Sequence, residues 1–71
     1  MTITITSTTY KGKQVLVGTD DEGHTIGPVA SETIINETSD SHAVAEEFFG
    51  GSRRIVSVDH DRNFVHATVE D

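Results

Sequence analysis

The sequence predicts an α+β domain, in which an antiparallel sheet of four or five strands packs one face against a single amphipathic helix. Three observations predict this fold. Several short segments alternate apolar with polar residues and are rich in β-branched side chains, as half-buried strands are. Glycine-containing turns separate these segments, and only one segment has the apolar periodicity of a helix. With 71 residues in total, the chain is expected to form one domain spanning residues 1–71.

The N-terminal part is predicted to form a β-hairpin. Residues 2–10, TITITSTTY, place Ile3 and Ile5 on one face of a strand and threonines on the other. The KGK sequence at 11–13 supplies a glycine where a tight hairpin turn requires a positive φ. Residues 14–19, QVLVGT, form the second strand, with two valines on the face opposite the leucine.

A third, weaker strand is predicted at residues 24–30, HTIGPVA, after a DDEG turn at 20–23. Pro28 has no N–H to donate to a neighbouring strand, so it belongs on a sheet edge or at a strand end. Residues 31–37, SETIINE, leave two alternatives open. Their β-branched content and short length favour a strand, but a helical turn after Pro28 also fits.

Residues 38–51, TSDSHAVAEEFFGG, carry the signal of an amphipathic helix. One of residues 39–41 is expected to cap the N-terminus, because short polar side chains accept hydrogen bonds from the first backbone N–H groups. The two glycines end the helix. The apolar face must be buried against the sheet, and it comprises Val44, Ala45, Phe48 and Phe49.

Two more strands are predicted at residues 53–58, RRIVSV, and 63–69, NFVHATV. In the first strand, Val56 and Val58 are expected to share one face. In the second, alternation predicts an apolar face of Val65, Ala67 and Val69 and a polar face of His66 and Thr68.

The DHDR sequence between these strands, residues 59–62, is interpreted as their connecting turn, since aspartate favours turns by bonding nearby backbone groups. The alternative is a metal or proton-transfer site around His60. Such a site would need further ligands such as His24, His66 or Glu70, and their spacing matches no zinc or calcium pattern. The turn is preferred, and we predict no metal, no cofactor and no catalytic residue.

The charge balance restricts the partners. Twelve acidic residues against five basic ones give a formal net charge of −7. Nucleic-acid phosphates and an anionic membrane would both be repelled, so we expect no direct nucleic-acid or membrane binding and a neutral or basic protein partner. The chain has no cysteine and no recognisable signal peptide, which favours the reducing cytoplasm. A domain this small has little room for an enclosed active site, so we expect a surface-acting protein rather than an enzyme.

Three acidic clusters are the predicted partner-binding residues. They are Asp20, Asp21 and Glu22 in a loop, Glu46 and Glu47 on the helix, and Asp59 and Asp61 near the last turn. One interpretation is that these charges keep a small protein soluble or adapt it to high salt. The functional interpretation is that the carboxylates imitate nucleic-acid phosphates and occupy a basic groove, in which case binding weakens as salt rises.

The N-terminal hairpin, the lone helix SHAVAEEFFGG and the C-terminal strand pair, in an acidic chain without cysteine, resemble the small phage-encoded anti-CRISPR inhibitors. The likeness spans the chain as architecture and charge, without a shared motif, so no residue role is carried over. It implies a stoichiometric inhibitor in the host-cell cytoplasm. Its partner would be a CRISPR effector, a basic nucleic-acid-binding complex whose DNA-binding surface it blocks.

Two rival functions remain open. An adaptor or subunit would bind through an exposed sheet edge near Pro28, and its binding would survive high salt or produce a homodimer. A small metal protein would use His24, His60 and His66 with nearby carboxylates, and a divalent metal would stabilise it. In solution, a monomer or a weak homodimer is expected.

Overall fold

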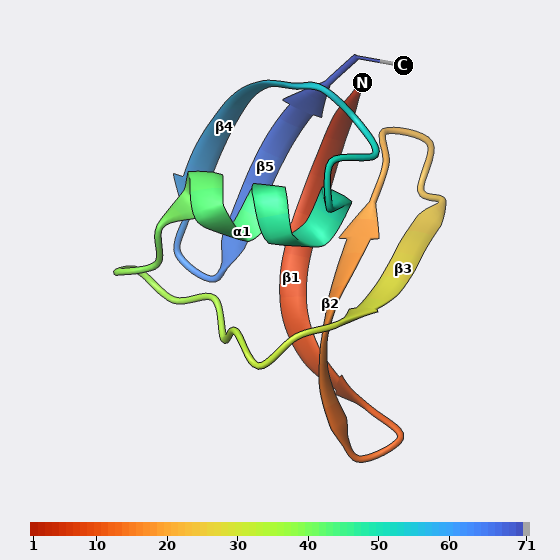
Figure 1. Cartoon of the computed structure of the whole chain (residues 1–71), viewed down its shortest axis with the longest axis vertical. Coiled ribbons are helices and arrows are strands. Elements are labelled where there is room, and N and C mark those ends of the chain that lie inside the picture. Colours follow the sequence, from red (N-terminus) through yellow and green to blue (C-terminus); the bar gives the residue numbers. More distant parts are fainter. Residues whose placement is uncertain (71) are drawn as a thin grey trace.

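A computed structural model, which describes residues 1–70, confirms the α+β fold and shows five strands (Figure 1). The strands form one antiparallel sheet in the order β3-β2-β1-β5-β4, and the helix lies across one of its faces. The elements are β1 (Thr2–Tyr10), β2 (Lys13–Thr19), β3 (Thr25–Ala30), α1 (Ser41–Phe49), β4 (Ile55–Asp61) and β5 (Phe64–Val69).

The core lies between α1 and the sheet face that it covers. Ile3 and Ile5 of β1 are fully buried, and cross-strand pairing places them on the same side as the apolar face of β5. Gly18 of β2 lets the helix pack closely, because a Cβ at this position would lie 2.8 Å from both Ile3 Cγ2 and Phe48 Cζ. The helix contributes the predicted set of Val44, Ala45, Phe48 and Phe49.

Both ends of α1 follow from the local sequence. The Oδ1 atom of Asp40 accepts hydrogen bonds from the backbone N–H groups of His42 (3.1 Å) and Ala43 (3.2 Å), which identifies the N-cap among the three candidates. At the other end Gly50 has a φ of 57°, and its N–H donates to the carbonyl oxygen of Glu46 at 2.8 Å. This left-handed glycine stops the helix.

Neither alternative predicted for residues 31–37 is correct, since residues 31–36 have no regular secondary structure. Side chains satisfy backbone groups that a strand partner would otherwise satisfy. The N–H of Ile35 donates to Ser7 Oγ at 3.0 Å, and the N–H of Thr33 donates to Ser31 Oγ at 3.0 Å. Ile35 is 2% exposed, so it anchors the segment to the core without sheet pairing.

The last turn lies further along the chain than the sequence predicts. β4 continues through Asp61, and the chain reverses at Arg62 and Asn63, with a φ of 54° at Arg62. Assigning Asp59, His60 and Asp61 to a turn is therefore wrong. Cross-strand pairing with β5 extends to the end of the hairpin and overrides the local turn preference of aspartate.

The start of β4 also departs from simple alternation. Its register against β5 shifts between Ile55 and Ser57, which leaves Val56 as an extra residue in a bulge. Val56 is consequently 57% exposed. The expectation that it shares an apolar face with Val58 is wrong, because a bulge interrupts the two-residue period.

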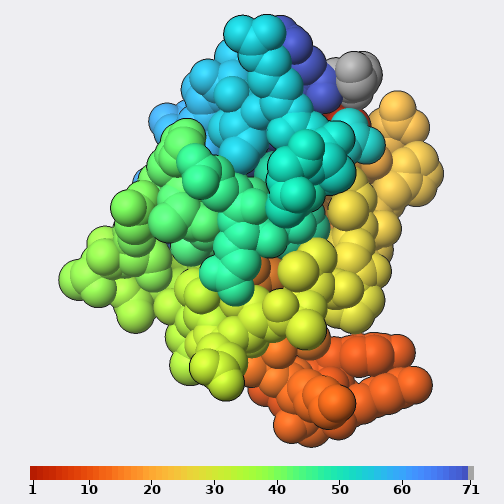
Figure 2. Space-filling model, in the orientation of Figure 1, coloured from red at the N-terminus to blue at the C-terminus, as the bar shows by residue number. Residues whose placement is uncertain are grey.

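The predicted N-terminal hairpin is confirmed, and its tip projects from the molecule (Figure 2). Lys11 and Gly12 have φ values of 51° and 78°, as a two-residue turn with positive φ at both positions requires. β1 pairs with β5 only along residues 2–6, so the end of the hairpin is a two-stranded ribbon. At this end the Nζ of Lys11 lies 5.4 Å from the ring centre of Tyr10.

Candidate protein-binding surface

The three predicted acidic clusters lie on different parts of the molecule. The first occupies the β2–β3 turn, and the second lies on the exposed side of α1. The third lies on β4, where Asp59 and Asp61 face His66 and Phe64 across the strand pair. These β5 residues alternate with buried Val65, so both aspartates point to the sheet face away from α1. No single face therefore carries all seven carboxylates.

In the first cluster, Asp20 organises the β2–β3 turn. Its Oδ1 accepts hydrogen bonds from the backbone N–H groups of His24 (2.8 Å) and Glu22 (2.9 Å). The bond from His24 is the main reason why the pKa of Asp20 is lowered from its ordinary value of 3.8. Asp21 also has an internal contact, because its Oδ2 accepts from the N–H of Thr2 at 3.4 Å. This cluster therefore has a structural role.

The helix cluster also has internal partners. Glu47 accepts hydrogen bonds from the hydroxyls of Ser31 and Thr33, and so ties the irregular segment after β3 to the helix. Glu46 lies one turn after His42, with 2.9 Å between Glu46 Oε1 and His42 Nδ1. These contacts hold both carboxylates against neighbouring groups of the same molecule.

The β4 cluster differs in this respect. Asp59 and Asp61 are exposed, and their carboxylates form no hydrogen bond or ion pair with the other residues of the stretch 1–70. The regular strand spaces them about 7 Å apart. Phe64, directly opposite Asp61, is 44% exposed. A large aromatic side chain thus lies beside two carboxylates that are available to a partner.

These residues belong to the sheet face opposite α1, which we call the uncovered face. Thr4 and His66 lie on it, with 3.0 Å between Thr4 Oγ1 and His66 Nδ1. Thr6 pairs with Phe64 on one side and with Val17 on the other. A row of Val17, Thr6 and Phe64 therefore crosses three strands of the uncovered face and ends next to Asp61.

Sequence reasoning missed several features of this surface. Phe64 lies at an alternate position of β5 with His66 and Thr68, so the two-residue period alone would have placed it with them on the uncovered face. Glu32 and Glu37 were missed as exposed acidic groups. The available signal was the distribution of charge, because residues 14–52 contain eight acidic side chains and no lysine or arginine.

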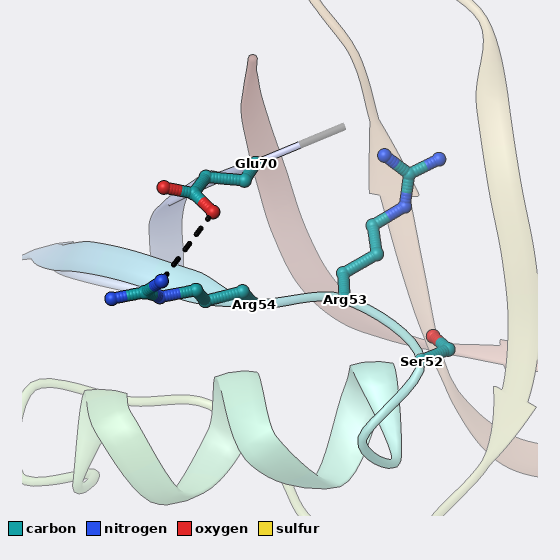
Figure 3. Close-up of a pocket in the computed structure, with 4 residues that line it drawn as sticks. All are labelled: Ser52, Arg53, Arg54 and Glu70. Atoms are coloured by element: carbon teal, nitrogen blue, oxygen red, sulfur yellow. Dashed lines mark ion pairs between the residues drawn. The ribbon is translucent and has the colours of Figure 1, made fainter.

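An open cleft of about 430 Å³ lies near the chain termini, lined by Ser52, Arg53, Arg54 and Glu70 (Figure 3). The two guanidinium groups point in different directions, as Figure 3 shows. Arg54 Nη1 lies 3.8 Å from Glu70 Oε2. The cleft therefore does not direct both arginines toward one anionic group.

The histidines of the alternative metal site lie in different settings. His24 Nδ1 lies 3.3 Å from Asp20 Oδ2 in the β2–β3 turn. His60 Nε2 lies 2.9 Å from the carbonyl oxygen of Arg62, and His66 contacts β1. Within residues 1–70, no three histidine, aspartate or glutamate side chains are grouped so as to hold a metal ion.

Comparison of the chain with protein-family models, curated proteins and solved structures finds no match. None of the helices in the described part of the chain, residues 1–70, has the length and apolar character needed to cross a membrane.

Proposed function

We propose that this protein is a non-catalytic binding protein that docks the uncovered face, with Asp59 and Asp61 at its β4 margin, on a basic surface of a partner protein. The observation that carries the proposal is that a regular strand holds these two exposed carboxylates without internal partners. Their charge is available to a lysine or arginine of the partner, and such complementarity determines specificity and association rate.

Phe64 supports the same surface. Aromatic residues are enriched among the side chains that dominate binding energy. Because Phe64 lies opposite Asp61, one lysine or arginine can pair its charge with the carboxylate and lay its aliphatic stem on the ring. A basic surface therefore fits this margin better than an acidic or a purely apolar one.

The remaining carboxylates contribute at longer range. The eight acidic residues of the stretch 14–52 have no lysine or arginine among them, so they add to the negative long-range potential of the molecule. Such a field speeds the approach of a basic partner and is screened by salt within about 8–10 Å at physiological ionic strength. Association is therefore expected to slow as salt concentration rises.

The concrete form of the proposal is inhibition of a basic nucleic-acid-binding protein. Asp59 and Asp61 replace phosphates in contacts with lysine and arginine, and the protein occupies the nucleic-acid site. The resemblance to anti-CRISPR inhibitors in architecture and charge makes a CRISPR effector in the host cytoplasm the first partner to test. The proposed role is stoichiometric, without chemistry on the partner.

The test measures DNA binding by a panel of purified CRISPR effector complexes, with and without the protein. We expect the protein to reduce DNA binding by at least one effector. The double variant Asp59→Lys/Asp61→Lys is expected to lose at least about tenfold in inhibitory potency, because attractive contacts become repulsive.

The matched control is Glu32→Lys/Glu37→Lys. It makes the same change in net charge at two exposed carboxylates that also lack partners within residues 1–70. Retained inhibition in this control, with loss in the β4 variant, supports a specific face. Equal losses would instead show that net charge alone is responsible, and unchanged inhibition in the β4 variant would contradict the proposal.

A further inference from the structure

The two edges of the sheet differ in their capacity to accept another strand. At the β3 edge, Pro28 has no backbone N–H, and the preceding Gly27 has a φ of 99°. At the opposite edge, residues 57–61 of β4 pair regularly with β5 and contain no proline. Proline and bulges are among the means of blocking a sheet edge, and residues 57–61 of β4 have neither, so their backbone is the more open template for a strand of opposite charge.

The backbone groups that face outward at this edge can be identified from the hairpin register. A two-residue turn makes Asp61 and Phe64 a hydrogen-bonded pair, and the next such pair is Asp59 with His66. Backbone hydrogen bonds alternate in direction along a strand. The N–H and C=O groups of Val58 and His60 therefore point away from β5, where an added strand would bind them.

The side chains of the same stretch specify the chemistry of such a strand. Asp59 and Asp61 lie on the uncovered face, whereas Val58 lies on the helix side and packs against the core. Opposite residues of paired strands share a face. An added strand would therefore place two alternate side chains beside the carboxylates of Asp59 and Asp61, and the next side chain toward the start of β4 beside Val58.

From these observations we infer that β4 binds an extended segment of a partner protein by strand addition, and that this segment carries basic residues opposite Asp59 and Asp61 and an apolar residue opposite Val58. The inference rests on the proposed function and states how the basic partner engages the β4 margin. It also moves the predicted sheet-edge site from the strand containing Pro28 to the opposite edge.

The charges of β4 disfavour a second copy of this chain as the occupant. Symmetric antiparallel pairing along residues 57–61 places Asp59 opposite Ser57, opposite Asp59 or opposite Asp61 of the other copy. None of these registers provides a cation, and like charges directly opposite one another destabilise a strand pair. A basic segment satisfies both carboxylates in one register.

The test uses a labelled peptide containing Lys-Val-Lys-Val-Lys and measures its binding to the whole protein by fluorescence anisotropy. Two control peptides have the same charge. In one, the lysines are adjacent and the valines follow; in the other, alternate backbone amides are N-methylated. Strand addition predicts that each control binds about tenfold more weakly or worse, because register or hydrogen bonds are lost.

A protein variant tests the same point from the other side. His60→Pro removes an outward-facing N–H at a sheet edge, where proline is tolerated, and His60→Val removes the imidazole but keeps that N–H. We expect His60→Pro to weaken peptide binding about tenfold relative to His60→Val. If His60→Pro does not fold, the N-methylated peptide remains the deciding measurement.

The outcomes separate this inference from the proposed function. If Asp59→Lys/Asp61→Lys abolishes peptide binding while N-methylation and His60→Pro have no effect, strand addition is wrong and the acidic docking face remains. If the charge reversal has no effect on peptide binding or on effector inhibition, the proposed function fails. A stable dimer of the protein that His60→Pro dissociates would assign the edge to a second copy and overturn the inference.

Discussion

Strand β1 divides its side chains between two different surroundings. On the helix side, Ile3 and Ile5 are fully buried among core residues. On the uncovered face, Thr4 and Thr6 are only partly buried, and their contacts are with cross-strand neighbours. Most of the burial that stabilises a domain this small is thus on one side of a single sheet. The uncovered face contributes less to stability. Substitutions on the helix side should therefore lower the free energy of unfolding, and substitutions on the uncovered face should lower the affinity for a partner.

The largest effect is expected from Phe48→Ala, which removes a core ring that is 5% exposed and packs edge-to-face on Phe49 at 5.0 Å between ring centres. The free energy of unfolding should fall by about 3–5 kcal/mol. Thr6→Ala on the uncovered face should change it by no more than about 0.5 kcal/mol. Urea unfolding followed by circular dichroism measures both, and similar losses would contradict the division between the faces.

A smaller loss, about 1–3 kcal/mol, is expected from Gly18→Ala. The added methyl group would meet Ile3 and Phe48 at 2.8 Å, so the helix must move or the ring must leave its rotamer. A second substitution, Phe48→Leu, removes the clashing ring atom. The double variant should therefore lose less stability than the sum of the two single variants, as measured in a double-mutant cycle. Simple additivity would show that the close contact does not limit packing.

A pH-dependent effect is expected at Asp20, outside the core. Backbone N–H groups lower its pKa from 3.8, so the ionised form is favoured in the folded state. Its contribution to stability is present above pH 3.8 and is lost as pH falls through the lowered folded-state pKa. The free energies of unfolding of the protein and of the Asp20→Asn variant should therefore differ near neutral pH and converge as the pH falls below 3.8. A constant difference across this range would exclude linkage to Asp20.

The smallest effect on stability and the clearest effect on binding are expected from Phe64→Thr. Because Phe64 is 44% exposed on the uncovered face, the free energy of unfolding should change by no more than about 0.5 kcal/mol. Affinity for a basic partner should fall about tenfold or more. The matched control is Tyr10→Thr, which removes a 51% exposed ring from the hairpin tip and should leave affinity intact. Affinity is measured by titrating each variant with the basic partner. Equal losses of affinity in the two variants would argue against a specific surface.

Elements defined by local periodicity or by a single glycine could be predicted from the sequence. The alternation of Ile3 and Ile5 and the apolar face of α1 both identified the core. Gly12 and Gly50 marked the ends of a strand and of the helix. These signals depend on residues close together in the chain, so tertiary contacts did not override them.

Features that depend on pairing between distant segments could not be predicted in this way. The bulge at Val56 and the position of the last turn follow from the register between β4 and β5. Ile35 is buried without belonging to a strand or helix, because Ser7 of β1 satisfies its backbone N–H. For the candidate site, the sequence identified Asp59 and Asp61 as acidic residues. Only the fold distinguishes their carboxylates, which have no internal partner, from those of Asp20 and Glu47, which accept hydrogen bonds within the molecule.

The projecting hairpin tip also determines where the protein reacts with amine-directed reagents. Both lysines of the chain, Lys11 and Lys13, flank Gly12 at this tip. Apart from the N-terminal amine, every primary amine therefore lies on one ribbon, and β4 contains none. A dye or a sensor surface coupled through lysine would attach at the hairpin and leave the β4 edge unmodified. The molecule thus has a built-in point for oriented immobilisation.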